Sequence, residues 1–409
     1  MSIRAAIPLM LIAFTTIAAE PLMAGIATSN ITPDTKALHV PLGGYGERQN
    51  APAEGVHDNT LCKALILKQG ERKFALVTVD LLGIPRSLRD EVLARITAAG
   101  IASDNLMLLA SHSHGSIEMA AMNRKNVFDN KAIGIYDEKL LVFTADRIAE
   151  AIVNAGKQYQ PVRVGTVSQK LEGMNRNRRN SPIIDDELTV TRFDGTDGRP
   201  VAVFVNWTAH PTFSGPQTMT VTADWPGYLQ REIEGFLPGA TCLYSNGAEG
   251  DISTAGAQGP SEFARMEDYG RKLAVKVLDL IKDVETSGNP VFDYSMTTLN
   301  LPDRVVPAAL KDAAGPEYGL TPENLPALLD ALSPPTSYLG VLRVGDLVAV
   351  SIPGEMASSL GLEIKTALRD AGAKSPIIAG LGNEWISYML PTDEYHKGGY
   401  EPGVSFYGE

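Results

Sequence analysis

The sequence predicts an α/β protein in which helices flank a core of mixed β-sheet. Short apolar runs with the length of buried strands alternate along the chain with longer segments whose apolar residues recur at helical spacing. Hydrophobic residues make up 44% of the chain and charged residues 21%, which is the composition of an ordinary globular protein. Because no internal repeat and no linker interrupts this pattern, we expect one large domain from Gly25 to Glu409.

The predicted strands share runs of β-branched and other apolar side chains between turn-forming residues. They comprise Lys73 to Asp80, Asn105 to Ala110, Pro161 to Val167, Glu187 to Phe193, Val201 to Asn206 and Leu342 to Ile352. The predicted helices share an amphipathic pattern. They comprise Arg86 to Ala99, Asp137 to Ala155, Gly227 to Phe236, Glu262 to Val284 and Met356 to Ala371.

A proline-rich stretch from Ala313 to Thr336 interrupts the alternation of strands and helices and contains one short predicted helix, Pro322 to Leu332. It reads as an inserted surface segment. Two interpretations stay open, a lid near a functional site and an inert connection.

Residues 1–24 have the pattern of a secretory signal peptide. Arg4 supplies the positive start, Ala5 to Ala19 is the apolar stretch, and Leu22-Met23-Ala24 offers a small-residue cleavage site. The apolar stretch is short for a transmembrane span, and no later segment is long and apolar enough to cross a bilayer. We therefore expect a secreted or periplasmic protein without stable membrane insertion, and an uncleaved N-terminal anchor is the alternative.

The charge balance limits the partners. The formal net charge is −12, and the main basic run is Arg176-Asn177-Arg178-Arg179, which argues against nucleic acid and against tight binding to anionic membranes. The two cysteines, Cys62 and Cys242, lack metal-ligand spacing. One disulfide and two buried free thiols are both open alternatives, and the oligomeric state is not predicted.

Two of the six histidines fall in Ser111-His112-Ser113-His114-Gly115, directly after the apolar run Leu106 to Ala110. Because residues i and i+2 of a strand face the same side, both imidazoles are expected to leave the strand end together. Imidazole is a good ligand for Zn²⁺ or a similar metal. The pair therefore predicts a metal or catalytic site, and histidines bonded to neighbouring backbone are the alternative.

Other polar residues occupy similar positions. His210 follows the strand Val201 to Asn206, and Glu355 lies where an apolar strand meets a helix, so it suits either a metal ligand or a favourable charge at the helix start. Asp224 suits either a helix cap or a partner of a histidine ligand. In the glycine-containing loop after Tyr244, Asp251 and Ser253 place a carboxylate near a hydroxyl.

Taken in order, these segments resemble the neutral ceramidase family, zinc-dependent amidases that release a fatty acid from N-acylsphingosine. The resemblance is one of motifs and extends from Gly43-Gly44-Tyr45 to Tyr407-Gly408. It implies a neutral-ceramidase-like zinc hydrolase domain over residues 25–409, without the immunoglobulin-like C-terminal domain of the family. The departures from its motifs are Gly115-Ser116 in place of S-G-P, Glu249 as an insertion, and Thr254 in place of proline.

The resemblance also implies a Zn²⁺ site. The family patterns T-H-T-H-S-G-P, N-W-F-A-x-H-P, P-G-E and N-x-Y-x-x-Y place the four ligands on His112, His210, Glu355 and Tyr388. The second histidine of the first pattern, a substrate-side residue in the family, falls on His114. The catalytic serine of S-N-x-G-D-V-S-P-N falls on Ser253. The active-site arginine of N-R-S-P falls on Arg176, or on Arg178, because the segment aligns in two ways.

We therefore hypothesise an exported zinc-dependent amidohydrolase that cleaves the N-acyl bond of ceramide or a related N-acyl lipid. His114 is the acid/base candidate for protonating the leaving amine, because its ordinary pKa lies near neutrality. Ser253 is either a nucleophile or a residue that orients water. The alternatives are a zinc hydrolase of the same fold acting on another amide or ester, such as an N-acyl amino acid or a lactone, and a non-enzymatic exported metal-binding protein.

Overall fold

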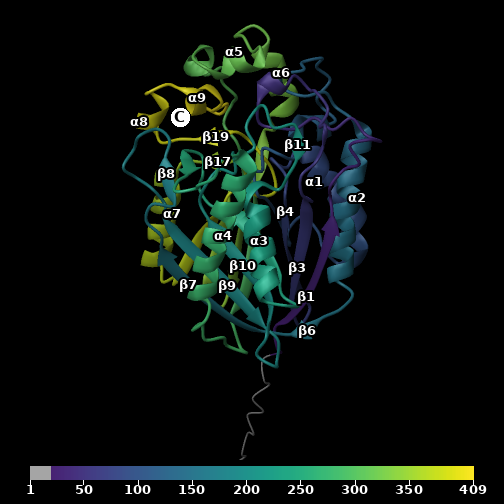
Figure 1. Cartoon of the computed structure of the whole chain (residues 1–409), viewed down its shortest axis with the longest axis vertical. Helices are drawn as coiled ribbons and strands as arrows, with labels where there is room; N and C mark the ends of the chain where they lie inside the picture. Colours follow the sequence, from purple (N-terminus) through teal and green to yellow (C-terminus); the bar gives the residue numbers. More distant parts are fainter. Residues whose placement is uncertain (1–19) are drawn as a thin grey trace, which may run out of the picture.

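Three β-sheets organise residues 20–409, which are the residues that the computed structural model describes (Figure 1). The first sheet has the order β5-β4-β3-β1-β6, the second β12-β10-β9-β7, and the third β14-β15-β16-β18. The strand bounds of the first are β1 Met23–Asn30, β3 Leu61–Gln69, β4 Arg72–Val79, β5 Leu106–Ala110 and β6 Gln160–Pro161. Those of the second are β7 Arg163–Lys170, β9 Glu187–Asp194, β10 Pro200–Trp207 and β12 Thr241–Asn246. Those of the third are β14 Phe292–Asn300, β15 Thr336–Val344, β16 Leu347–Ser351 and β18 Ser375–Ala379.

Each of these sheets contains one parallel pair of strands, namely β4 with β5, β10 with β12, and β16 with β18, and its remaining pairings are antiparallel. A helix makes the crossover within each pair: α1 Arg86–Ile96, α3 Asp224–Phe236 and α7 Ser358–Asp370. The three pairs pack together, since β12 contacts β4, β5 and β18. The predicted mixed-sheet α/β architecture is therefore confirmed.

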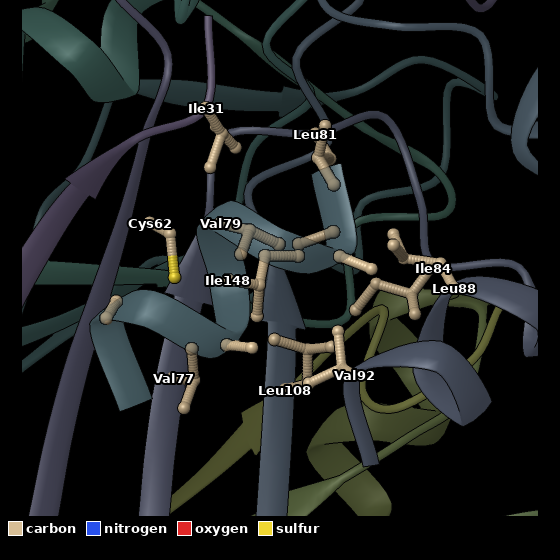
Figure 2. Packing of buried hydrophobic residues seen from close by; sticks show 14 of the residues in the cluster. Ile31, Cys62, Val77, Val79, Leu81, Ile84, Leu88, Val92, Leu108 and Ile148 are labelled. Atoms are coloured by element: carbon tan, nitrogen blue, oxygen red, sulfur yellow. The ribbon is translucent and has the colours of Figure 1, made fainter. Parts of the chain in front are cut away.

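The apolar core divides according to the sheet faces. The inner faces share one central cluster, to which Phe74, Phe204 and Leu342 contribute from the first, second and third sheets. On the outer faces, α1 and α2 (Glu138–Ala155) cover the first sheet, α3 and α4 (Glu262–Leu280) cover the second, and α7 covers the third. Figure 2 shows the first of these outer clusters, where Leu88 and Ile148 of the two helices pack on Val77 and Leu108.

The smaller elements lie mainly at one end of the molecule, the top of Figure 1. They are the helices α5 Ala314–Tyr318, α6 Leu325–Leu332, α8 Thr392–Tyr395 and α9 Tyr400–Gly403, and the paired strands β17 Glu355–Met356 and β19 Tyr388–Met389. Two further pairs are β2 Gly55–Val56 with β11 Thr220–Val221, and β8 Asn175–Asn177 with β13 Ile252–Thr254. Short 3₁₀ turns cover Gly46–Arg48, Thr97–Ala99, Met119–Met122 and Ala308–Lys311.

One predicted strand is wrong: Leu342 to Ile352 is not continuous but divides between β15 and β16. Gly345 takes a φ of 59° at the turn between them, a conformation that glycine adopts without strain. In the three main sheets, strands β1, β3, β12, β14 and β18 were not predicted from the sequence, while the predicted helices all exist with ends shifted by a few residues.

The predicted signal peptide spans residues 1–24, and its first 19 residues lie outside the described part of the chain. Leu22 is fully buried, and Met23 and Ala24 pair with both β3 and β6, so the first sheet includes the proposed cleavage site. In the part of the chain that the structure describes, no helix is long and apolar enough to cross a membrane. Cys62 and Cys242 are buried free thiols in separate apolar clusters, which excludes the alternative of a disulfide between them.

Candidate metal centre and cavity

The predicted ligands come from the carboxyl ends of the three parallel strand pairs, which meet at one end of the molecule. His112 follows β5, His210 follows β10, and Glu355 begins β17 just beyond β16. Tyr388 follows β18 and lies beside Glu355 in the pairing of β17 with β19. The open edge at the carboxyl ends of parallel strands is a common place for binding sites. The sheet topology thus brings together residues that are far apart in the sequence.

Hydrogen bonds fix the orientation of two imidazole rings. Nδ1 of His112 lies 2.6 Å from the carbonyl oxygen of Leu82, and Nδ1 of His210 lies 3.0 Å from that of Ile252. A carbonyl only accepts, so Nδ1 carries the proton in each ring and, in the neutral form, Nε2 presents a lone pair. Burial, followed by the charge of nearby Arg178, lowers the pKa of His210 to about 4, which favours that neutral form.

The two Nε2 atoms face one carboxylate oxygen. Oε2 of Glu355 lies 3.3 Å from Nε2 of His112 and 3.1 Å from Nε2 of His210, and the Tyr388 hydroxyl lies 3.5 Å from the latter. All four side chains are buried. The lone pairs of the two Nε2 atoms repel the negative carboxylate oxygen unless a cation lies between them. Zinc is a cation that accepts imidazole nitrogen, carboxylate oxygen and phenol oxygen as ligands. These residues therefore fit a zinc ion.

His114 differs from the other two histidines. Its Nε2 lies 3.3 Å from Nε2 of His112, but its Nδ1 is buried without a hydrogen-bond partner in the described structure. Gly44 explains how the ring fits, because a Cβ there would lie 2.0 Å from that Nδ1. Burial, followed by the neighbouring histidines, holds the pKa of His114 well below its ordinary value.

Two donor sets are geometrically available. The side chains of His112, His114 and His210 bring ligand atoms within 4.8 Å of one another, and the predicted set replaces His114 by Glu355 and Tyr388. A metal-bound histidine usually donates its second ring nitrogen to a carbonyl or carboxylate. His112 and His210 meet this condition and His114 does not, which favours the predicted set.

The arginine that reaches this centre is Arg178. Its Nη2 donates to the Tyr388 hydroxyl at 3.0 Å and to the Gly250 carbonyl at 2.9 Å, while Nε donates to Glu401 at 2.7 Å. Arg176 is exposed on β8, whose neighbouring Asn175 and Asn177 point inward, so of the two open assignments the structure brings Arg178, and not Arg176, to the centre. Strand alternation alone would place Arg176 and Arg178 on the same side, but β8 ends at Asn177, and Arg178 turns toward the centre beyond the end of the strand.

Ser253 lies next to the centre through its backbone. It forms a bridge with His210 and pairs with Arg176, is partly buried, and does not line the cavity described below. Asp251 accepts from the Ser358 amide and from Asn177, and Asp224 accepts from the amides of Ser214 and Trp225. Neither carboxylate has a hydrogen bond to a histidine in the described structure, so both hold loops rather than ligands.

Two residues that the sequence did not single out support the ligands. Nε1 of Trp385 donates to Oε1 of Glu355 at 2.8 Å and leaves Oε2 for the histidines. Glu401 accepts from Arg178 and also from Arg179, at 2.7 Å in each case, and so fixes the guanidinium that contacts Tyr388. Trp385 lies three residues before Tyr388, inside the segment that carries the N-x-Y-x-x-Y pattern, so its closeness to a predicted ligand was the signal that the sequence offered.

A largely apolar cavity opens onto the centre. His112, His114, Glu355 and Tyr388 line it at one side, and Tyr318, Leu320, Leu328, Leu332 and Ser333 line it from the proline-rich segment. Of the two interpretations of that segment, the structure supports a cover over a site. Burial raises the pKa of Glu118, another lining residue, to about 7, and its oxygens accept from the amides of Gly44 and Ala120.

Comparisons with known proteins agree with this architecture. A family model described as neutral/alkaline non-lysosomal ceramidase, N-terminal, matches residues 22–242. The neutral ceramidase of Pseudomonas aeruginosa is 22% identical over 475 aligned residues, covering 95% of this chain and 69% of that relative. Neutral ceramidase B of Dictyostelium discoideum is 21% identical, covering 74% of this chain and 58% of that relative.

Solved structures give the same result for the fold. A structure described as a ceramidase complexed with C2 matches with a TM-score of 0.82 at 20% identity, covering 95% of this chain and 72% of the other. The crystal structure of the neutral ceramidase from Pseudomonas aeruginosa matches with a TM-score of 0.81 at 20% identity, covering 96% and 72%. The predicted fold class is confirmed by both.

Proposed function

The chain belongs to the neutral/alkaline non-lysosomal ceramidase family, and from this premise we propose that it is a zinc-dependent hydrolase that cleaves the amide bond of ceramide or a related N-acyl lipid. The observation that carries the proposal is the pair of Nε2 lone pairs, from His112 and His210, directed at Oε2 of Glu355 beside an apolar cavity. This donor set calls for a cation, and the cavity suits a hydrocarbon chain.

In this proposal His112, His210, Glu355 and Tyr388 hold Zn²⁺. When bound, the ion would supply Lewis-acid chemistry for the amide carbonyl and for the attacking water. Arg178 holds the Tyr388 oxygen in place through its 3.0 Å hydrogen bond, and Trp385 holds the Glu355 carboxylate through its 2.8 Å bond. These contacts orient the ligands before substrate enters.

His114 is proposed to move the proton. Hydrolysis forms a carbon–oxygen bond, breaks the carbon–nitrogen bond and requires a proton on the departing nitrogen. His114 lines the cavity beside the proposed ligands, and burial lowers its pKa, so the protonated ring is formed only transiently and is a strong acid toward that nitrogen. Ser253, beside His210 in the backbone, is proposed to act as the nucleophile or to orient the attacking water.

We also propose that the chain is exported and that its leader is cleaved. A leader that ends before Leu22 would leave the first sheet intact, because Leu22 is buried and Met23 begins β1. The proposed location is therefore the periplasm or the exterior, and the N-terminal residue of protein recovered from those fractions tests it. A mature chain beginning at Gly25 or later would count against this placement of the leader's end.

The test of function combines metal analysis with substrate hydrolysis. We expect the purified protein to contain about one zinc per chain and to release fatty acid from ceramide dispersed in detergent. A chelator should abolish this release and added Zn²⁺ should restore it. Undiminished turnover by metal-free protein would overturn the zinc proposal, and stable zinc binding with no cleavage of any acyl substrate would support the non-enzymatic alternative.

A further inference from the structure

The cavity contains a cluster of polar side chains that the proposed mechanism leaves unused. We call Arg86, Asn123, Ser333 and Glu384 the polar cluster; all four line the same cavity as the proposed metal ligands. In the described structure no hydrogen bond joins any of them to those ligands. Their role has to be sought in what the cavity binds.

Two members of the polar cluster are bonded to each other, and the other two lie beside them through neighbouring residues. Arg86 donates to Glu384 through Nε at 2.7 Å and through Nη2 at 2.6 Å, and Nη2 also donates to the Thr336 carbonyl. Thr336 lies three residues after Ser333 in the sequence. Ser87, next to Arg86, donates to Oδ1 of Asn123 at 3.3 Å. The cluster is therefore a built part of the cavity wall rather than a chance exposure of polar atoms.

The cluster carries no net charge toward a ligand. The bidentate pair neutralises both members, and the Arg86 and Glu384 side chains are only 26% and 2% exposed. A carboxylate bound here would meet Glu384, and an ammonium would meet Arg86. A neutral polar group avoids the repulsion between like charges that either ion would meet in this nearly buried site.

Two donors of the cluster lack good acceptors. Oδ1 of Asn123 accepts from Ser87 and from the Lys125 amide at 3.1 Å, but its Nδ2 donates to no described residue. Nη1 of Arg86 has only a long contact of 3.4 Å with Oγ1 of Thr336. Asn123 is 9% exposed. Free N–H donors in a nearly buried wall are best satisfied by an acceptor that the ligand brings.

We propose that the polar cluster binds a neutral oxygen, a carbonyl or hydroxyl, carried on the hydrocarbon chain of an N-acyl substrate. The proposal rests on the amide hydrolysis proposed above. The hydrocarbon part of the substrate would contact apolar residues that line the same cavity, namely Leu82, Met119 and Trp385. Met119 and Trp385 lie close together, because both contact the position of Gly83. The oxygen belongs either to the acyl chain or to the chain of the amine.

The test compares matched amides on the zinc-loaded enzyme. One series varies the length of an oxoacyl chain on a fixed aryl amine, and the second places the ketone on an alkyl amine with a fixed acyl group. Plain chains of equal length are the reference in both. At the best chain length in one series, we expect kcat/KM for the ketone-bearing amide to be about tenfold higher than for the plain amide of equal length. This ratio corresponds to the free energy of about one net hydrogen bond.

Variants identify the donor. Asn123→Asp keeps the oxygen that caps the turn but replaces the Nδ2 donor, so the preference for the ketone should fall to about one. Leu328→Ala, in the apolar wall, should slow both members of a pair alike and leave their ratio unchanged. A ratio near one in both series, or a ratio that survives Asn123→Asp, overturns the proposal. Failure to cleave any amide overturns the proposed function instead.

Discussion

The proposed metal ligands and the cover of the cavity are held by different forces. Each of the histidine ligands has a directed hydrogen bond to a backbone carbonyl, and Glu355 and Tyr388 have theirs from Trp385 and Arg178. The cover, residues 313–336, is held chiefly by apolar packing of α6 against the C-terminal run that includes Phe406. Its polar contacts with the rest of the chain include the 3.1 Å contact between the Tyr318 and Tyr400 hydroxyls, the 3.2 Å hydrogen bond from the Gly46 amide to Glu317, and the 2.8 Å ion pair of Asp330 with Arg304. None of these joins the cover to a proposed metal ligand.

This difference predicts two kinds of response to substitution. Directed bonds position atoms within tenths of an ångström, so a change at a ligand alters the chemistry itself. Apolar packing is non-directional and scales with area, so a change in the cover alters how well a chain is bound.

The largest effect is expected from a ligand. His210→Ala removes one of the two Nε2 atoms that face Glu355, so bound zinc should be lost and activity should fall at least about a thousandfold, because several kcal/mol of transition-state stabilisation depend on the ion. Metal content and kcat/KM measure this. The control is His39→Ala, an exposed histidine, which should keep both. Full zinc content in His210→Ala would contradict the ligand set.

His114 separates proton transfer from ligation. His114→Ala should retain zinc and lose about 10²-fold to 10⁴-fold in kcat, because general acid–base catalysis contributes on that scale. If His114→Ala loses zinc to the same extent as His112→Ala, then the three-histidine donor set is correct and Glu355 with Tyr388 is not.

The proposed metal ligands could be predicted from the sequence more readily than the residues that form the cavity wall. A polar residue directly after a buried strand is conspicuous, so His112 and His210 stand out in the sequence, and strand topology then brings them together. The cavity wall combines Leu82, Ile133, Leu328 and Phe406 from distant segments. Such side chains look like ordinary core in a sequence, and only tertiary packing makes them the wall of a cavity.

Local geometry explains two further limits of sequence analysis. The turn at Gly345 inside an apolar run changes one predicted strand into two, since a single glycine and aspartate interrupt the pattern only slightly. The choice between Arg176 and Arg178 depends on where β8 ends, because Arg178 reaches the centre only after the chain has left the strand at Asn177, and the sequence does not specify that end. Both cases concern the exact residue at which a strand ends, which depends on local backbone geometry that the sequence pattern does not specify.

The two arginines provide a matched pair for the next prediction. Arg178→Met removes the donor to Tyr388 and leaves Glu401 without one partner, so kcat should fall about a hundredfold, in line with the loss of one group that orients a metal ligand. Arg176→Met removes an exposed side chain and should stay within about twofold of the parent. The reverse ranking would restore Arg176 as the active-site residue.

The smallest effect is expected from the cover. Leu332 lines the cavity and is only partly buried, so Leu332→Ala should leave zinc content and kcat close to those of the parent. It should raise KM for a long-chain amide about fivefold to tenfold, because each buried methylene group contributes about 0.8 kcal/mol. Glu323→Ala, on the exposed surface of the same segment, should change neither constant.

Because short-chain amides do not reach the cover, their KM should be insensitive to Leu332→Ala. This dependence on chain length distinguishes a loss of chain binding from a general loosening of the fold. A fall in kcat for chains of every length would mean that the cover positions the ligands, and the division drawn above between directed bonds and apolar packing would then fail.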